Sequence, residues 1–473
     1  MNPVKFVFWD TETTGLNKAF HIPVEIGAVV TDGNLRPVRE VNLACRPPRF
    51  VLVEPGALLT TGRRVSELLS RSMSGYEASC DFVETVRAVT PACFVTYNGV
   101  RFDDPLIQHT LFRYLHDPYL MLKGGNFRID LLPVVELAFA LNMPDLAVPR
   151  SEHGKPTFKL DRIAPLNGFD EGEAHSAVGD ARAVHYLARL LAQRAPELWD
   201  RACCLWSSKN AVRNFIARSD IFVEFTWDWR HGGPCFKALT PVALGRGYAG
   251  EFVCLDLTLD PNDYTSLAPD ELVTKITIGT KPRPICTVRL NGVPIVFSIN
   301  DPLVKDRIAL DAATLAERAR CIRSNVGLRE RVLDAVDLKR DSFEEPTYPE
   351  QQLYSGGFIS DHDTLVAQRF HAAPLASKVQ LAATFRDGRL RYLAEHLIYE
   401  EWAELLDAST RARIDGEMRT RHLANADAPW TTIASALRDI NKLLLEADER
   451  ARRILLEYRE QLLALYPIAS AAE

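Results

Sequence analysis

Two carboxylates stand one residue apart near the amino terminus, in the stretch VFWDTETTGLN, which otherwise has the apolar character of a buried β-strand. They belong to Asp10 and Glu12, and residues i and i+2 of a strand point to the same face of the sheet. Two like charges that project together repel one another unless a positive group lies between them. Because Mg²⁺ prefers carboxylate oxygens, the pair predicts a metal site. The alternative is two solvated acids at an exposed strand end.

Two later stretches carry residues of related types. In YNGVRFDD, Asn98 and Phe102 precede Asp103 where a strand end meets a helix start, and Asp103 alone is also a plausible N-cap residue. In HSAVGDA, His175 stands five residues before Asp180, and a histidine at such a place is by itself typical of a surface. The ordered set D-x-E, N-x-x-x-F-D and H-x-x-x-x-D is far more specific than any one of its parts.

Hydrophobic patterns predict the elements that position these side chains. Residues 4 to about 191 have a mixed α/β pattern, and the expected elements follow along the chain. They are a strand over 4–15, two strands over 24–47 joined at the turn signal DGN, a strand, loop and helix over 93–115, and a helix over 175–199. In the helix after Asp103, we expect one face to be formed by Leu106, Thr110, Leu111 and Tyr114.

The rest of the chain changes pattern twice. Residues 234–297 show a period of two with Gly, Pro and Asn turns, which predicts short strands, KITIGT among them, in a small barrel or sandwich. Residues 303–335 look helical, 337–357 look like a linker, and nearly all that follows looks helical. A final helix has a stripe of apolar residues at Ala451, Leu455, Tyr458, Leu462 and Leu465. We therefore expect domains at 1–192, 193–345 and 346–473.

Composition excludes several classes of protein. The net charge of −6 is not that of a general nucleic-acid binder, so any such surface must be local. No run of about 18 apolar residues predicts a membrane helix, and the first 30 residues lack the pattern of a secretory signal. The nine cysteines form no C-x-x-C, which favours reduced thiols in a cytoplasmic protein without a zinc site. GRGYAG, at 245–250, precedes a strand-like stretch and not a helix, so it predicts a hairpin turn, with Arg246 and Tyr248 facing a ligand, and no dinucleotide site.

The ordered carboxylates and histidine resemble the DEDD family of 3′→5′ exonucleases, in the branch with a histidine in the last motif. VRFDDPLIQHTLFRYLHDPY, KPTFKLDRIAPLNGF, RSNVGLRERVLDAV and QLYSGGFIS further resemble the bacterial exodeoxyribonuclease I family. The resemblance implies an α/β ribonuclease-H-like exonuclease domain, an SH3-like barrel domain and a C-terminal helical domain that together form a clamp. It also implies processive degradation of single-stranded DNA from the 3′ end to 5′-mononucleotides, in repair and recombination.

The same resemblance implies roles for single residues. Asp10, Glu12, Asp103 and Asp180 would bind two Mg²⁺ ions, for which Mn²⁺ can substitute, and would stabilise an in-line phosphoryl displacement. His175, with an unperturbed pKa of about 6.5, is suited to take a proton from the attacking water near neutral pH. Lys159 stands where the family has an arginine that contacts phosphate, which keeps the charge and loses the bidentate geometry.

Contacts to single-stranded DNA are expected from further residues. Asn291 in RLNGVP matches the family, and the aromatic rings of Tyr119, Tyr248 and Tyr354 are candidates for stacking on bases. Arg289 belongs to a stretch, 273–333, that is locally basic, although a solvated charged helix face is an equal alternative for any one arginine. Its basic residues are Lys275, Lys281, Arg283, Arg289, Lys305, Arg307, Arg318, Arg320, Arg323, Arg329 and Arg331.

Competing functions stay open at this point. The motifs do not separate DNA from RNA, since that discrimination lies in contacts to the 2′-hydroxyl. An RNA-directed exonuclease of the same branch and a polymerase proofreading subunit are both expected to be shorter than 473 residues. A catalytically silent single-strand clamp would be expected to lack one of the carboxylates, and all are present. The resemblance also implies binding to the acidic tail of single-stranded DNA-binding protein, and one chain forming the whole clamp favours a monomer.

Overall fold

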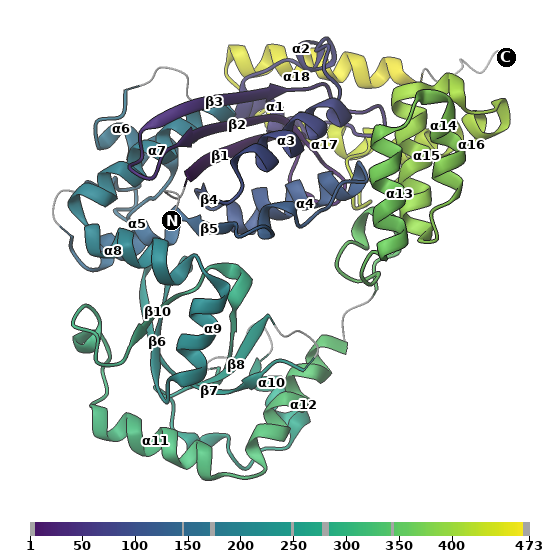
Figure 1. Cartoon of the computed structure of the whole chain (residues 1–473). Coiled ribbons are helices and arrows are strands. Elements are labelled where there is room, and N and C mark those ends of the chain that lie inside the picture. Colours follow the sequence, from purple (N-terminus) through teal and green to yellow (C-terminus); the bar gives the residue numbers. More distant parts are fainter. Residues whose placement is uncertain are drawn as a thin grey trace.

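The computed structural model describes residues 5–143, 146–170, 176–246, 250–276, 283–341 and 345–466. Figure 1 shows an α/β region at the amino-terminal end, a second sheet with its own helices below it, and a group of carboxyl-terminal helices to one side. This arrangement confirms the predicted order of an α/β region, a small β region and a helical region; where a small barrel or sandwich was predicted, the structure has one five-stranded sheet.

The first sheet has five strands in the order β3-β2-β1-β4-β5. β1 pairs antiparallel with β2 and parallel with β4, and β2 pairs antiparallel with β3, which is the mixed topology expected of a ribonuclease-H-like sheet. The strands are β1 (Lys5–Thr13), β2 (Pro23–Thr31), β3 (Pro37–Ala44), β4 (Ala92–Thr96) and β5 (Phe127–Asp130).

Alternating side chains of β1 enter two different cores. Phe6 and Phe8 pack with helices α5 (Leu131–Ala140), α7 (Ala177–Arg194) and α8 (Pro196–Arg201). Val7 and Trp9 pack with α3 (Gly75–Val89) and α4 (Asp103–Arg113) on the opposite face. The helices α1 (Pro55–Thr61), α2 (Val65–Leu69) and α6 (Leu160–Leu166) complete this region. The period of two in the sequence of β1 therefore decides which helix each later side chain will face.

The second sheet is antiparallel throughout and has the order β10-β6-β7-β8-β9. Its strands are β6 (Phe222–Asp228), β7 (Gly233–Leu244), β8 (Glu251–Asp256), β9 (Ile285–Arg289) and β10 (Ile295–Ser298). The helices beside it are α9 (Lys209–Arg218), α10 (Pro269–Ile276), α11 (Ala312–Ser324) and α12 (Leu328–Asp341). Strands β6 and β10 of this sheet share a hydrophobic core with the first region, since Phe225 and Val296 belong to the same buried cluster as Phe8.

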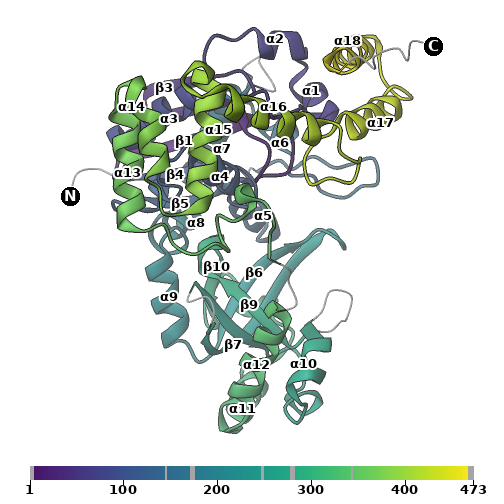
Figure 2. The same ribbon diagram turned by 90° about the vertical axis from the view of Figure 1, so that its right-hand side faces the viewer.

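The carboxyl-terminal helices form two groups. The helices α13 (Asp361–Ala372), α14 (Leu375–Ala383), α15 (Gly388–Trp402) and α16 (Ala408–His422) pack together beside α4. The helices α17 (Ile433–Leu443) and α18 (Glu449–Leu465) return to α1 and α2, where Ile440 and Leu455 share a core with Leu58. Figures 1 and 2 both show this return from two directions.

Several sequence-based boundaries differ from the structure. Residues 303–335, expected to be helical, contain a 3₁₀ turn at Lys305–Arg307 and then α11 and α12, because Asp311 caps α11 and the chain turns at 325–327. The linker expected over 337–357 begins later than predicted, because α12 extends to Asp341. In KITIGT, the first two residues end helix α10, so the predicted strand is wrong there, and the rest of that stretch lies outside the described residues.

Other predictions hold. The residues Leu106, Thr110, Leu111 and Tyr114 are all buried, as expected for one packed face of a helix. In α18, Leu455, Tyr458 and Leu462 are buried, but Leu465 is 48% exposed because the helix ends there beyond its packed neighbours. No two of the nine cysteines, all in described segments, form a disulfide. Among the helices that the structure describes, none is long and apolar enough to cross a membrane.

Candidate active site

Three carboxylates meet at the edge of the first sheet. Ligand atoms of Asp10, Glu12 and Asp180 all lie within 4.8 Å of one another. Two of these residues come from the end of β1 and the third comes from the first turn of α7. Oxygens of this kind at this separation can all reach one divalent cation, so the structure brings together three of the four carboxylates that the sequence singled out.

Successive side chains of β1 point to opposite faces of the sheet, so this one strand positions carboxylates on both faces. Asp10 and Glu12 continue the face of Phe8, which packs under α7. Thr11 points the other way, toward α4, and its hydroxyl donates a hydrogen bond to the Oδ1 atom of Asp103. Asp103, the fourth carboxylate, is only 6% exposed and stands at the first position of α4. A single strand therefore supplies two acids directly and fixes a third through a buried hydroxyl.

Helix α7 approaches the sheet closely because of one glycine. Gly27 lies opposite Asp10 in the β1–β2 register, and a Cβ atom on it would lie 2.1 Å from the backbone of Ala177 and Val178. Glycine in a strand interior often marks such a close approach of another backbone. The Ser176 hydroxyl caps the helix by accepting a hydrogen bond from the Gly179 amide at 3.2 Å. These contacts place the first turn of α7, and with it Asp180, over the end of β1.

The charges in this cluster disfavour one another. Burial, followed by the neighbouring Asp103, Asp180 and Glu12, raises the pKa of Asp10 well above its usual value. Burial, with Asp180 next in effect, raises the pKa of Glu12 to about 8. Burial also raises the pKa of Asp103 to about 7, although the hydrogen bond from Thr11 opposes the shift. A set of acids under this mutual repulsion gains strongly from a bound cation.

A buried ion-pair group lies beside Glu12. Its cross-strand neighbour Glu25 is 3% exposed and contacts Arg63 at 2.6 Å and Arg71 at 2.5 Å. The two guanidinium groups balance the charge of Glu25, and Arg63 also lowers the pKa of Glu12 against the larger effect of burial. No local pattern in the sequence marks this group, because the two arginines lie 38 and 46 residues after Glu25.

Asp104, the neighbour of Asp103, links the site to the second region. Its carboxylate forms a buried ion pair with Arg128, the second residue of β5. The Nη2 atom of Arg128 donates a hydrogen bond of 2.8 Å to the carbonyl oxygen of Asn291. Asn291 lies in a 3₁₀ turn between β9 and β10, so this arginine joins the start of α4 to the second sheet.

The predicted base and the predicted DNA contacts are spread over the chain. His175 lies outside the described residues. Lys159 is exposed just before α6. Tyr119 is partly buried and packs against the core that the first region shares with α13–α16. Tyr354 is 57% exposed, and its hydroxyl donates a hydrogen bond of 2.5 Å to Gln108 on α4.

The predicted contacts of the second region differ in their surroundings. Arg289 is exposed at the end of β9. Arg246 forms ion pairs with acids on α12, among them Asp334 at 2.6 Å, and its predicted neighbour Tyr248 lies outside the described residues. Within the basic stretch, Arg318 and Arg331 donate hydrogen bonds to backbone carbonyls of their own region. The positive charge of 273–333 is therefore partly structural.

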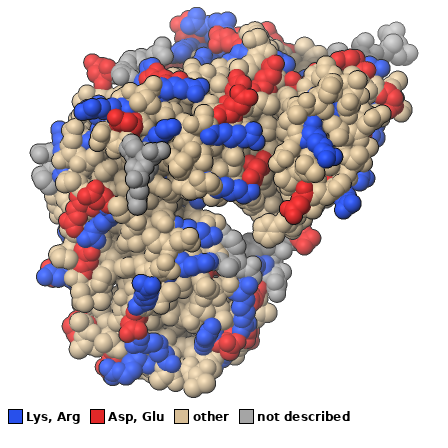
Figure 3. Space-filling model, in the orientation of Figure 1, with Lys and Arg blue, Asp and Glu red and all other residues tan. Residues whose placement is uncertain are grey.

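A hollow lies between part of the second region and the rest of the molecule, while the two share a hydrophobic core elsewhere. Figure 3 shows it between the lower lobe and the upper body, with several Lys and Arg side chains along its edges. Figure 1 places α13–α16 on one side of this opening and the first sheet above it. The concave shape with positive charges at its rim suits a polyanion.

Comparisons with known proteins agree with this geometry. A family model described as Exonuclease matches residues 7–188, and one described as Exonuclease I C-terminal domain matches residues 347–462. Exodeoxyribonuclease I of Escherichia coli (strain K12) is 26% identical over 430 residues, covering 86% of this chain and 88% of the relative. Exodeoxyribonuclease I of Buchnera aphidicola subsp. Acyrthosiphon pisum is 29% identical, covering 82% and 95%.

Solved structures match the fold over nearly the whole chain. E. coli Exonuclease I in complex with a dA16 oligonucleotide has a TM-score of 0.87 at 23% identity, covering 98% of this chain and all of the other. A structure of SSB/Exonuclease I with an inhibitor has a TM-score of 0.85 at 22% identity. The fold and the carboxylate site define a ribonuclease-H-like exonuclease, whose family depends on divalent metals. More narrowly, the relatives that this chain resembles over most of its length are named exodeoxyribonuclease I, and its carboxyl-terminal part matches the Exonuclease I C-terminal domain.

Proposed function

We propose that this exonuclease degrades single-stranded DNA from the 3′ end and releases 5′-mononucleotides. The observation that carries the proposal is the meeting of Asp10, Glu12 and Asp180, with Asp103 held beside them by Thr11. Relatives named exodeoxyribonuclease I, matched over 86% of this chain in the E. coli case, support DNA as the substrate. In a cell, the activity would serve the repair and recombination of DNA.

We further propose that the four carboxylates bind two Mg²⁺ ions, with Mn²⁺ able to substitute. The donor set fits, since it consists of carboxylate oxygens only and its members raise one another's pKa. When bound, such ions stabilise the attacking and the leaving oxygens of a phosphodiester. Thr11 keeps Asp103 in one orientation, and Arg63, which pairs with Glu25, partly offsets the repulsion that Glu25 exerts on Glu12.

His175 is the proposed general base. It precedes Asp180 by five residues, and an imidazole with an ordinary pKa can accept a proton from water near neutral pH. The proton would leave as the water attacks the terminal phosphodiester, and the released nucleotide would keep the 5′ phosphate.

The proposed path of the DNA is the hollow between the second region and the rest of the molecule. Lys159, Tyr119, Arg289, Asn291 and Tyr354 remain the proposed contacts, through phosphate charge, hydrogen bonds and base stacking. We keep 192 and 345 as proposed domain boundaries. The hollow would hold the strand while each 3′ nucleotide reaches the carboxylates.

Further proposals concern the state of the protein in the cell. We propose a cytoplasmic monomer that binds the acidic carboxyl-terminal tail of single-stranded DNA-binding protein. The solved structure of SSB/Exonuclease I supports this partner. A monomer is supported by the fact that one chain supplies all three regions around the hollow.

The experiment that tests this proposal measures the degradation of 5′-labelled single-stranded DNA and of an RNA of the same sequence, in Mg²⁺ and in EDTA. The variants are Asp10→Ala and, as a matched control, Glu84→Gln, which replaces an exposed acid on α3. We expect Mg²⁺-dependent shortening of DNA from the 3′ end, at least 10-fold slower loss of RNA, and no activity with Asp10→Ala. Faster loss of RNA would assign the enzyme to the ribonuclease branch. If neither DNA nor RNA is shortened, the protein is a catalytically silent clamp.

A further inference from the structure

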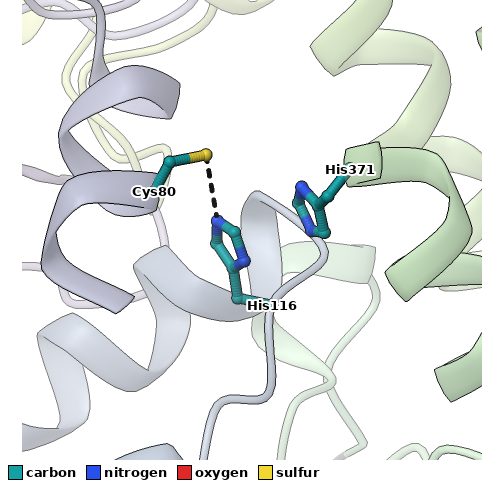
Figure 4. A group of neighbouring side chains, drawn as sticks. All are labelled: Cys80, His116 and His371. Atoms are coloured by element: carbon teal, nitrogen blue, oxygen red, sulfur yellow. Dashed lines mark hydrogen bonds between the residues drawn. The ribbon is translucent and has the colours of Figure 1, made fainter. Parts of the chain in front are cut away.

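A second group of metal-ligating side chains lies away from the carboxylates. Cys80, His116 and His371 each offer a ligand atom, and these atoms all lie within 4.8 Å of one another (Figure 4). Cys80 belongs to α3, His116 follows α4, and His371 is near the end of α13. The group therefore joins the exonuclease region to the carboxyl-terminal helices, across 291 residues of sequence between its first and last members.

The three side chains are of the types that bind zinc. Thiolate sulfur and imidazole nitrogen form most structural zinc sites, usually in tetrahedral geometry. All three side chains are partly buried, as is common for structural metal ligands.

The distances suit a tetrahedral ion. The Cys80 Sγ atom lies 3.7 Å from the His116 Nε2 atom. With bonds of about 2.3 Å to sulfur and about 2.1 Å to nitrogen, that separation corresponds to an S–Zn–N angle of about 115°, close to tetrahedral. The third ligand needs a small movement, because the His116 and His371 rings are stacked in parallel with centroids 4.0 Å apart. The His371 ring would have to turn out of this stack for one of its nitrogens to face the ion.

The contacts of His371 allow this turn at the cost of two hydrogen bonds. Its Nδ1 atom is 3.0 Å from the Tyr76 hydroxyl, and its Nε2 atom is 3.2 Å from the Leu115 carbonyl oxygen. The Ser79 hydroxyl lies 3.1 Å from the His116 Nε2 atom and would lose this contact when that nitrogen binds metal, while it keeps its hydrogen bond of 2.7 Å to the Tyr76 carbonyl oxygen. Metal bonds from a thiolate and two imidazoles outweigh these neutral hydrogen bonds.

We propose that Cys80, His116 and His371 form a zinc site that fixes the carboxyl-terminal helices to the exonuclease region. Water fills the fourth position, and the thiol proton of Cys80 passes to solvent when the ion binds. The absence of a C-x-x-C motif led the sequence analysis to expect no zinc site, and the ligands here come from three separate segments. The site is distinct from the carboxylates, whose oxygens favour Mg²⁺.

The test uses the full-length protein, freed of metal with a chelator and then titrated with Co²⁺ in excess Mg²⁺ so that the carboxylates are occupied. We expect one Co²⁺ per chain with the thiolate-to-cobalt absorption band of a tetrahedral site. We also expect that Zn²⁺ displaces it and raises the unfolding temperature. The variants Cys80→Ser and His371→Gln should lose the band and bind at least 10-fold more weakly. The control His362→Gln replaces a partly buried histidine on the same helix, whose ring contacts the Thr384 carbonyl oxygen, and should keep both the band and the affinity.

Each other outcome decides against the site. If Cys80→Ser keeps the band, another cysteine binds the ion. If the wild-type protein shows no band, or if Zn²⁺ raises its unfolding temperature no more than that of Cys80→Ser, the three side chains form only a packed hydrogen-bonded contact. Unfolding curves recorded in EDTA show whether each variant folds, which separates loss of the metal site from loss of structure.

Discussion

Replacing Gly27 by alanine would place a methyl group between β2 and the start of α7. The new Cβ atom would lie 2.1 Å from the backbone carbon of Ala177 and the nitrogen of Val178, where ordinary contact begins at 3.4 Å. Neither neighbour is a flexible side chain, so strand and helix must separate by more than about 1 Å to relieve the repulsion. The first turn of α7 carries Asp180, which would move away from Asp10 and Glu12 by a similar amount.

Metal ligands tolerate deviations of only about 0.2 Å, and a misplacement of about 1 Å in a catalytic group can lower a rate by about 100-fold. We therefore expect kcat of Gly27→Ala on single-stranded DNA to fall by about 100-fold. Overpacking should lower the free energy of unfolding by about 1–3 kcal/mol, which leaves a folded protein. The affinity for DNA, measured by fluorescence anisotropy in Ca²⁺ without turnover, should stay within a factor of about 3, since the hollow is unchanged.

The matched control is Gly416→Ala, at an exposed position within α16 where a new Cβ atom meets no other atom within 4 Å. It should keep full activity and gain slightly in stability, because alanine favours a helix. If the Gly27→Ala protein has the kcat of the wild type, the conclusion that this close backbone contact positions Asp180 is wrong. An unfolded Gly27→Ala protein, judged by circular dichroism, would show that the contact supports the fold as a whole.

Three further predictions concern Thr11, Arg128 and His116. Thr11→Val removes the hydroxyl that holds Asp103, so the Mg²⁺ concentration for half-maximal rate should rise about 10–100-fold, measured by titration. Arg128→Met leaves the Asp104 carboxylate buried without its partner, so the free energy of unfolding, measured by chemical denaturation, should fall by about 3–5 kcal/mol. The double variant with Asp104→Asn should recover much of this stability. Burial keeps His116 neutral in the folded state, so only the unfolded chain gains its proton as pH falls below about 6.5, and stability falls with it. In EDTA, the free energy of unfolding of His116→Gln should therefore fall by about 2 kcal/mol less than that of the wild type between pH 7.5 and pH 5. An equal fall in both proteins would contradict the pKa assignment.

The carboxylate site was predictable to a large extent because its signals are local. The period of two in β1 fixes the common face of Asp10 and Glu12, and the transition from strand to helix fixes Asp103 at a helix start. The same alternation directs Thr11 toward α4, although a threonine in a strand has no pattern that marks this role. Gly27 did carry a signal, since a glycine inside an apolar strand indicates the close approach of another element. What it could not indicate was which element comes close.

Contacts between distant segments had no signal in the sequence. Arg128 bonds to a backbone carbonyl 163 residues further along, and any polar atom at that place would serve equally. The return of α17 and α18 to α1 depends on apolar stripes that fit a helical bundle as well as they fit this surface. The basic stretch 273–333 shows the converse, because a charge count does not distinguish arginines that face solvent from those, such as Arg318, that bond within their own region.

Three hydrophobic cores decide how the regions are held relative to the carboxylates. The core around Phe8 continues into the second sheet, the core around Phe112 includes Phe370 and Leu397 of the helices beside α4, and the core around Leu58 includes Leu455 of α18. Regions joined by polar contacts alone usually move relative to one another, whereas a continuous apolar core resists such motion. The hollow and the carboxylates are therefore positioned together when the chain folds. The proposed path of the DNA is therefore preformed, and substitutions within these shared cores should impair DNA binding and unfolding stability together.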